Sequence, residues 1–185
     1  DLIVASNDSA FANEFLCKFP SSSAHEPDTL LGMRIQATEE CILLSQLKHI
    51  HHGLEELGLL EAKPAETPLT PNLQLHPASE EEHEKFKSLN INYRSAIGLM
   101  NYIACLTRPD ISFAVSSLSR FCTKPGISHW NEVKRTWQYL KKTINYNLCV
   151  RPQKLNDKHL VMFSDATWED DPNTRKSQSG YLGFV

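Results

Sequence analysis

The sequence predicts an α+β fold, with helices in the middle of the chain and short strands toward both ends. Three observations predict it. Apolar residues recur at helical spacing between residues 93 and 142. Short apolar runs such as "CILLSQ" and "HLVMFSD", bounded by polar residues, lie on either side of that region. Prolines at positions 64, 68, 71 and 77 forbid a helix there and favour an extended surface connection.

The bulk composition is that of a globular protein. The 185 residues are 41% hydrophobic and 22% charged, which is enough apolar material to bury a core. No run approaches the ~20 apolar residues of a membrane span, and no signal-peptide pattern opens the chain. The five cysteines are odd in number and lack a C-x-x-C pair. We therefore expect reduced, mostly buried intracellular thiols, and neither a disulfide framework nor a zinc site.

The first sixty residues are predicted to contain both strands and helices. The run "DLIVAS" predicts a short buried strand, and "DSAFANEFLCKF" predicts a helix with Asp8 or Ser9 as its cap. "TLLGMRI" and "CILLSQ" predict two strands joined by the polar turn "QATEE". Ser45 can cap the helix that follows, and Gly58 suits its C-terminal end. One face of that helix is apolar: Leu47, Ile50, Leu54 and Leu57.

The middle of the chain is predicted to be helical. The acidic run at residues 80–84 is expected to be a solvated helix start or loop, and a helix begins at Tyr93. Asp110 can cap a second helix, and "HWNEVKRTWQYLKKT" predicts a third. The core face of the third helix is Trp130, Val133, Trp137 and Leu140. After Asn145 three strands are expected: "YNLCV", "HLVMFSD" and "GYLGFV".

Charge is distributed unevenly along the chain. The net charge is −3, but residues 94–142 hold eight Lys/Arg and two Asp/Glu. Such a basic segment is a candidate phosphate-facing surface. Amphipathic helices also carry Lys and Arg outside for solubility alone, so that interpretation stays open. The phosphate-contact candidates lie largely off the apolar face of the third helix, with two more nearby: Lys134, Arg135, Lys141, Lys142, Arg120 and Lys124.

Asp165 ends a predicted strand, where a carboxylate is well placed to bind a metal ion. The residues Glu169, Asp170 and Asp171 that follow are expected to be turn carboxylates. A phosphatase of the haloacid-dehalogenase type would need a second Asp at position 167, which is Thr. His49 and His52 have spacing that could suit zinc, but a solvated helix face is the expected interpretation because no further ligand has suitable spacing.

The order of the motifs along the chain gives a family resemblance. "LLGMRI", "LLSQ", "AKPAETPL", "YRSAIG", "TRPDISFAV", "HWNEVKR", "YLKKT", "SDATWEDD" and "TRKSQSGY" follow one another with compatible spacing over nearly the whole chain. In this order they resemble the join between reverse transcriptase and ribonuclease H in copia-type retrotransposon polyproteins.

The resemblance implies four segments. Residues 1–60 would be the end of the polymerase palm and the start of the thumb, and residues 61–92 a Pro-rich acidic connection. Residues 93–145 would form the basic helical thumb and connection, and residues 146–185 the first strands of a ribonuclease H-like sheet. Both ends look cut through secondary structure, so we expect a fragment.

The resemblance also implies site residues. Asp1 would be the second Asp of the polymerase motif, and Asp165 the first ribonuclease H carboxylate, each without its partners. The complete parent would use Mg²⁺ or Mn²⁺ bound by several carboxylates. For this chain alone we expect no tightly bound metal and neither activity.

The partners expected from the resemblance are duplex nucleic acid or RNA–DNA hybrid, bound weakly and in a salt-sensitive way, and the remaining polyprotein segments. No membrane association is expected. The location would be intracellular: the cytoplasm, a virus-like particle or the nucleus. Two alternatives stay open, a duplex-binding remnant without catalysis and a chain that does not fold stably because its sheets are truncated.

Overall fold

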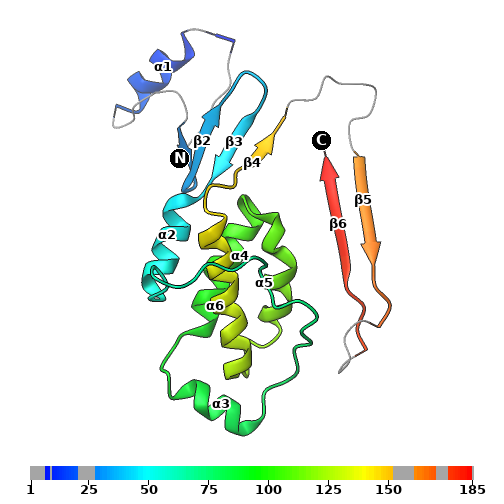
Figure 1. Ribbon diagram of the computed structural model, residues 1–185. Coiled ribbons are helices and arrows are strands. Elements are labelled where there is room, and N and C mark those ends of the chain that lie inside the picture. Colours follow the sequence, from blue (N-terminus) through cyan, green and yellow to red (C-terminus); the bar gives the residue numbers. More distant parts are fainter. Residues whose placement is uncertain (1–6, 9, 21–27, 152–160, 170–174, 185) are drawn as a thin grey trace. The chain divides into compact units, whose positions relative to one another are not determined.

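The computed structural model describes residues 7–8, 10–20, 28–151, 161–169 and 175–184 (Figure 1). It is mixed α and β, which confirms the predicted class, and it divides into two units, residues 1–150 and 151–185. The expected strand "DLIVAS", and Asp1 with it, lies outside the described residues.

The first unit contains an antiparallel sheet in the order β1-β2-β3-β4. Its strands are β1 (Thr29–Leu30), β2 (Met33–Ala37), β3 (Ile42–Ser45) and β4 (Leu148–Val150). The single strand expected for "TLLGMRI" is wrong, because the run folds back on itself at two residues. Leu31 and Gly32 have φ of +49° and +73°, the conformation of a tight hairpin turn.

The strand β4 joins this sheet from far along the chain. Cys149 lies opposite Leu43 of β3, so β4 belongs to the first unit. Residues 146–185 were expected to form one C-terminal segment, whereas the boundary between the two units follows Val150. Strand pairing over about a hundred residues leaves no local sign in the sequence, which explains the difference.

Helices make up the rest of the first unit. They are α1 (Phe11–Lys18), α2 (Leu47–Glu56), α3 (Glu80–Lys87), α4 (Tyr93–Leu106), α5 (Ser112–Ser119) and α6 (Ile127–Lys142), with a 3₁₀ turn η1 (Pro109–Ile111) before α5. The predicted core face of α6 is confirmed, since Val133, Trp137 and Leu140 are fully buried and Trp130 is 6% exposed. These side chains pack with the buried faces of α2 and α4 in one core.

The helix ends were predicted with mixed success. Gly58 follows α2 with φ +64°, as expected. Ser45 is not the cap of α2, because it is buried in β3 and the helix begins after Gln46. Asp110 is not the cap of α5 either, since it lies inside η1 and bonds to Arg108. At α4 the cap is Asn92, for which no prediction was made; its side chain accepts a hydrogen bond from the Ser95 amide at 3.0 Å.

The described residues of the second unit form a β-hairpin. β5 (Val161–Ala166) pairs with β6 (Ser179–Phe184) in antiparallel register, and Asp165 lies opposite Gly180. This confirms strands at "HLVMFSD" and "GYLGFV". Both faces of the hairpin are exposed.

We predict that Gly53→Ala destabilises the protein by about 1–3 kcal/mol through overpacking. A Cβ at Gly53 would lie 2.2 Å from Cη2 of the buried Trp137 ring, so α2 and α6 would have to separate. Gly98→Ala, inside α4 with nothing within 4 Å of the added Cβ, is the control and should stabilise by about 0.5–1 kcal/mol. Chemical denaturation measures both. Equal effects of the two substitutions would contradict the described packing of α2 on α6.

Candidate functional site

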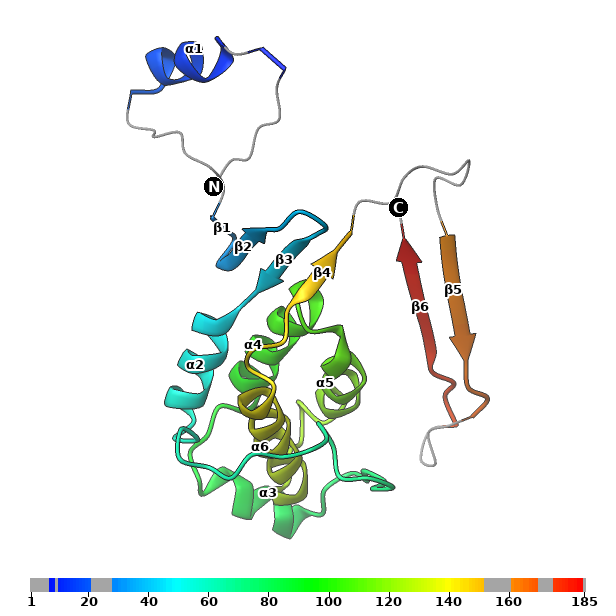
Figure 2. The same cartoon turned by 45° about the horizontal axis from the view of Figure 1, so that its top comes forward.

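An extended strap, residues 60–70, crosses α6 and bonds to three of its candidate phosphate-binding residues (Figures 1 and 2). Arg135 donates a hydrogen bond from Nη2 to the hydroxyl of Thr67 at 2.9 Å. Lys141 donates from Nζ to the carbonyls of Leu60 and Ala62. Lys142 forms an ion pair with Glu66. The strap therefore occupies much of the polar surface of α6.

Glu132 fixes the strap from the buried side. Its carboxylate accepts from both the amide and the hydroxyl of Thr70, each at 2.8 Å, and the residue is only 7% exposed. Thr136, fully buried, donates to the carbonyl of Pro68 at 2.9 Å. Sequence reasoning missed Glu132. The available signal was that it is an acid within the basic segment, next to the apolar positions Trp130 and Val133.

The other candidate cations lie at the two ends of this surface. Lys124 forms an ion pair with Glu80, and its hydrogen bond and charge lower the pKa of that exposed carboxyl. Arg120 lies with its guanidinium carbon 5.8 Å from the centroid of the Phe121 ring. Lys134, half-exposed in the middle of α6, makes no hydrogen bond or ion pair with any residue that the structure describes. The phosphate-binding role of these residues stays a prediction.

His129 joins the beginning of α6 to the segment after the strap. Its Nδ1 accepts from the amide of Gly126 at 3.0 Å, so Nε2 carries the proton and donates to the carbonyl of His76 at 2.9 Å. The ring stacks on Phe121 with centroids 3.9 Å apart and is fully buried. Burial lowers the pKa of His129, and the His76 carbonyl and the Glu82 charge oppose that shift only in part.

A buried arginine ties the α4–α5 connection to the end of α6. Arg108 is 2% exposed and donates to both carboxylate oxygens of Asp110, at 2.9 and 2.7 Å, and to the carbonyl of Thr143 at 3.0 Å. The ring of Tyr146 lies 5.4 Å from its guanidinium carbon, and the Tyr139 hydroxyl donates to Asp110. Burial alone would raise the pKa of Asp110, but the hydrogen bonds and charge of Arg108 outweigh it and lower that pKa.

Asp165 does not make up a metal site with its described neighbours. Its side chain is exposed, and Oδ1 accepts from the amide of Ala166 at 2.9 Å. No group of three or more His, Cys, Asp or Glu residues in the described ranges could hold a metal ion. Mg²⁺ takes several oxygen ligands in octahedral geometry, which one carboxylate does not supply. The ribonuclease H role of Asp165 therefore stays a prediction about a longer protein, and Asp1 lies outside the described residues.

The histidine and cysteine expectations need correction. His49 is not on a solvated face, because it is half-buried with its ring centroid 5.3 Å from that of Tyr102. His52 is exposed, as expected, and pairs with Glu56 at 3.4 Å between Nε2 and Oε1. Contrary to the expectation, the cysteines are not mostly buried: Cys17, Cys105 and Cys149 are exposed, and Cys41 and Cys122 are half-buried.

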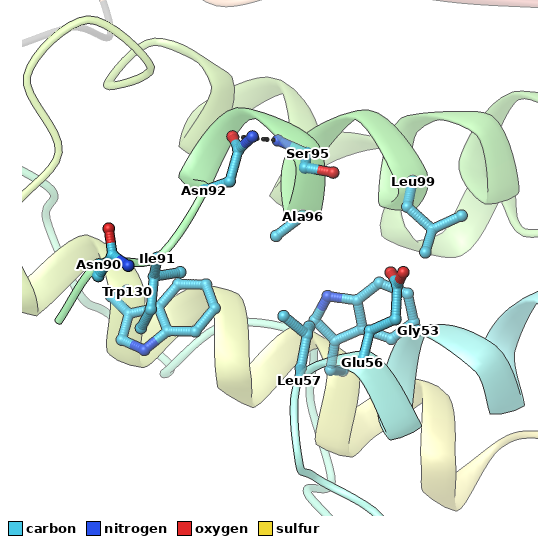
Figure 3. Close-up of a pocket in the computed structure, with 11 residues that line it drawn as sticks. Gly53, Glu56, Leu57, Asn90, Ile91, Asn92, Ser95, Ala96, Leu99 and Trp130 are labelled. Atoms are coloured by element: carbon cyan, nitrogen blue, oxygen red, sulfur yellow. Dashed lines mark hydrogen bonds between the residues drawn. The ribbon is translucent and has the colours of Figure 1, made fainter.

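A pocket of about 400 Å³ lies between α2, α4 and α6 (Figure 3). Leu57, Ile91, Ala96 and Leu99 supply apolar walls, and Trp130 and Trp137 line it from α6. The indole Nε1 of Trp137 is buried and has no hydrogen-bond partner among the described residues. Figure 3 shows Asn92 turned toward the amide of Ser95, which it caps, so its carbonyl oxygen is already used. The pocket presents no pair of groups arranged for acid–base chemistry.

Within the described residues, no helix combines the length and apolar character that a membrane crossing requires.

No protein-family model and no solved structure matches the chain. Among curated proteins, the "Retrovirus-related Pol polyprotein from transposon TNT 1-94" of Nicotiana tabacum is 38% identical over 159 residues, 83% of this chain. The "Retrovirus-related Pol polyprotein from transposon RE2" of Arabidopsis thaliana is 29% identical over an alignment of 191 residues that covers 100% of this chain. The chain spans 12% of the length of each of these relatives.

A shorter relative carries a different name. The "Secreted RxLR effector protein 161" of Plasmopara viticola is 41% identical over 93 residues, which is 50% of this chain and 64% of that protein.

We predict that the protein loses stability as pH falls below about 6.5, in part through His129. Because its folded pKa is lowered, the unfolded chain takes up the proton first, so acid favours unfolding until pH passes below the folded pKa. One such group contributes at most ~1.4 kcal/mol per pH unit. Denaturant unfolding between pH 5 and 7 should show a shallower pH dependence for His129→Gln than for the wild type. His51→Gln, at an exposed position, is the control, and an equal change in both variants would contradict the role of His129.

Proposed function

The chain belongs to the family of retrovirus-related Pol polyproteins from copia-type transposons, and from this membership we propose that it holds duplex nucleic acid by its phosphates. The position that we propose for it is the passage from the reverse transcriptase palm, through the thumb and connection, to ribonuclease H. In this assignment α4, α5 and α6 are the thumb and connection helices. Residues 151–185 are the start of ribonuclease H.

One observation carries the binding proposal. The segment 94–142 holds eight Lys/Arg and two Asp/Glu, and both acids are used inside the protein. Asp110 accepts from Arg108 and Tyr139, and Glu132 accepts from Thr70. Because both carboxylates already have these partners, neither forms an ion pair with the exposed cations of this segment. A surface of this kind attracts a polyanion without regard to its sequence.

The candidate cations divide by their present contacts. Lys134 makes no polar contact with a described residue, and Arg120 is exposed beside Phe121. Arg135 and Lys141 hold the strap, so their substitution would change the structure as well as the charge. The first test of phosphate binding therefore belongs to Lys134, and it includes Arg120 because that side chain is exposed.

We propose no catalysis by this chain alone. Phosphoryl transfer with two metal ions needs several carboxylates around the ions, and Asp165 is one. In a protein as long as the relatives, Mg²⁺ or Mn²⁺ would be the metal, and the other polyprotein segments would be partners. We place that assembly in the cytoplasm, a virus-like particle or the nucleus. Metal-dependent polymerase or ribonuclease H turnover by the purified chain would contradict this part of the proposal.

A second candidate function is duplex binding by a protein that takes no part in reverse transcription. The match to the RxLR effector, which the chain covers over 64% of its length, favours it, because related sequence there lies outside a Pol polyprotein. The two candidates share the binding surface and differ in the segments that accompany it.

We predict that Lys134→Ala combined with Arg120→Ala weakens binding to a DNA duplex roughly tenfold at low salt. The slope of log affinity against log salt should fall by about 1.8, at about 0.9 for each lost phosphate contact. Fluorescence anisotropy of a labelled duplex over a salt series measures both quantities. Lys48→Ala combined with Lys85→Ala removes the same charge from α2 and α3 and is the control. Equal losses in the two double variants would overturn the assignment of the surface.

A further inference from the structure

We propose that the chain covers part of its own phosphate-binding surface with two carboxylates, Glu66 of the strap and Glu80 of α3. In this arrangement each carboxylate occupies a lysine ammonium group that a nucleic-acid phosphate would otherwise take. The inference rests on the proposed function and adds an intramolecular competitor to it. Binding then requires exchange of Glu66 and Glu80 for two phosphates.

The two ion pairs have the same construction. Glu66 pairs with Lys142 at the C-terminal end of α6, and Glu80 pairs with Lys124 just before its N-terminal end. In both pairs the glutamate side chain is 80% exposed and the lysine side chain is 40% exposed. Both glutamates come from outside the basic segment, and both lysines belong to it. The cover thus reaches the two ends of α6.

Exposure makes each contact easy to exchange. Ion pairs in contact with solvent contribute little to stability and weaken with salt, so a phosphate can displace the carboxylate without unfolding the chain. Only the glutamate side chain has to rotate away. The backbone that carries it stays in place.

The anchors of the strap keep Glu66 close after it has been displaced. Thr67 is bonded to Arg135, and Thr70 to the buried Glu132, on either side of the Pro68 carbonyl that Thr136 holds. A tethered group of this kind competes at a high effective concentration, which short connections put in the millimolar range. Glu80 is held in the same way, since Ser79 caps α3 and His83 bonds to the carbonyl of Pro125 at 2.7 Å.

Near the middle of α6 the strap bonds to Arg135, but no carboxylate in the described part of the chain covers Lys134. Lys134 has no acidic partner among the described residues, so the wild type would bind through this centre and exchange its contacts at the ends. The neighbouring acids Glu61 and Glu81 are exposed and pair with no lysine in the described part of the chain. They provide a charge-matched control within the same two segments.

The test compares Glu66→Gln combined with Glu80→Gln against Glu61→Gln combined with Glu81→Gln. Both double variants lose the same charge, so any long-range gain in attraction is common to them. Anisotropy of a labelled DNA duplex should show roughly fivefold or greater tightening for the first pair over the second at low salt, and a slope steeper by up to about 1.8, at ~0.9 for each freed lysine. Adding Lys124→Ala and Lys142→Ala should abolish the difference.

The possible results distinguish the proposed function from the self-covering inference. If the wild type and every variant fail to bind the duplex even at low salt, the proposed function is wrong. If the wild type binds and loses affinity with Lys134→Ala and Arg120→Ala, but the two glutamine pairs behave alike, only the self-covering inference is wrong. A difference between the glutamine pairs that persists without Lys124 and Lys142 would also overturn it.

Discussion

The carboxylate of Glu132 is the contact on which the organisation of the first unit depends. Glu132 is only 7% exposed, and a buried carboxylate needs hydrogen-bond donors to replace the water it has lost. The amide and the hydroxyl of Thr70 both donate to it. These bonds hold a Pro-rich segment, which forms no helix or strand of its own, against α6. The positions of Glu66 and of the chain leading to α3 follow from that attachment. A surface that composition alone describes as basic is thereby partly covered by acidic neighbours.

A second buried charge, that of Arg108, holds the C-terminal end of α6. Arg108 links the turn before α5 to Thr143, directly after α6, and five residues later the chain enters β4. The pairing of β4 with β3 and the packing of Trp137 against Gly53 of α2 then close the unit. Both buried charges are joined to partners distant in sequence, which makes them sensitive to loss of either partner. The proposed function depends on the exposed lysines and arginines, which take no part in these buried contacts.

The local parts of this structure could be predicted from the sequence, and the long-range parts could not. The core face of α6 and the end of α2 at Gly58 follow from helical periodicity and from the conformational freedom of glycine. The hairpin at Leu31–Gly32 was not predicted because Leu is unusual at a positive φ, and because the residues on either side of the turn, Leu30 and Met33, are apolar. Arg135 and Lys141 had the right position for phosphate contacts, yet their hydrogen bonds go to the strap, which lies some seventy residues earlier. Neither the spacing of apolar residues nor a sequence motif predicts a hydrogen bond between residues so far apart.

Hydrogen exchange at the strap tests directly whether α6 holds residues 60–70 in place. The amide of Thr70 donates to Glu132, and the amide of Ala65 donates to the carbonyl of Gln138 at 3.3 Å. We predict slow exchange at both amides in the free protein, and faster exchange at Thr70 when Glu132 is replaced by Ala. Exchange at Thr70 and Ala65 as fast as in an unstructured peptide would contradict it, because the strap would then not lie on the helix.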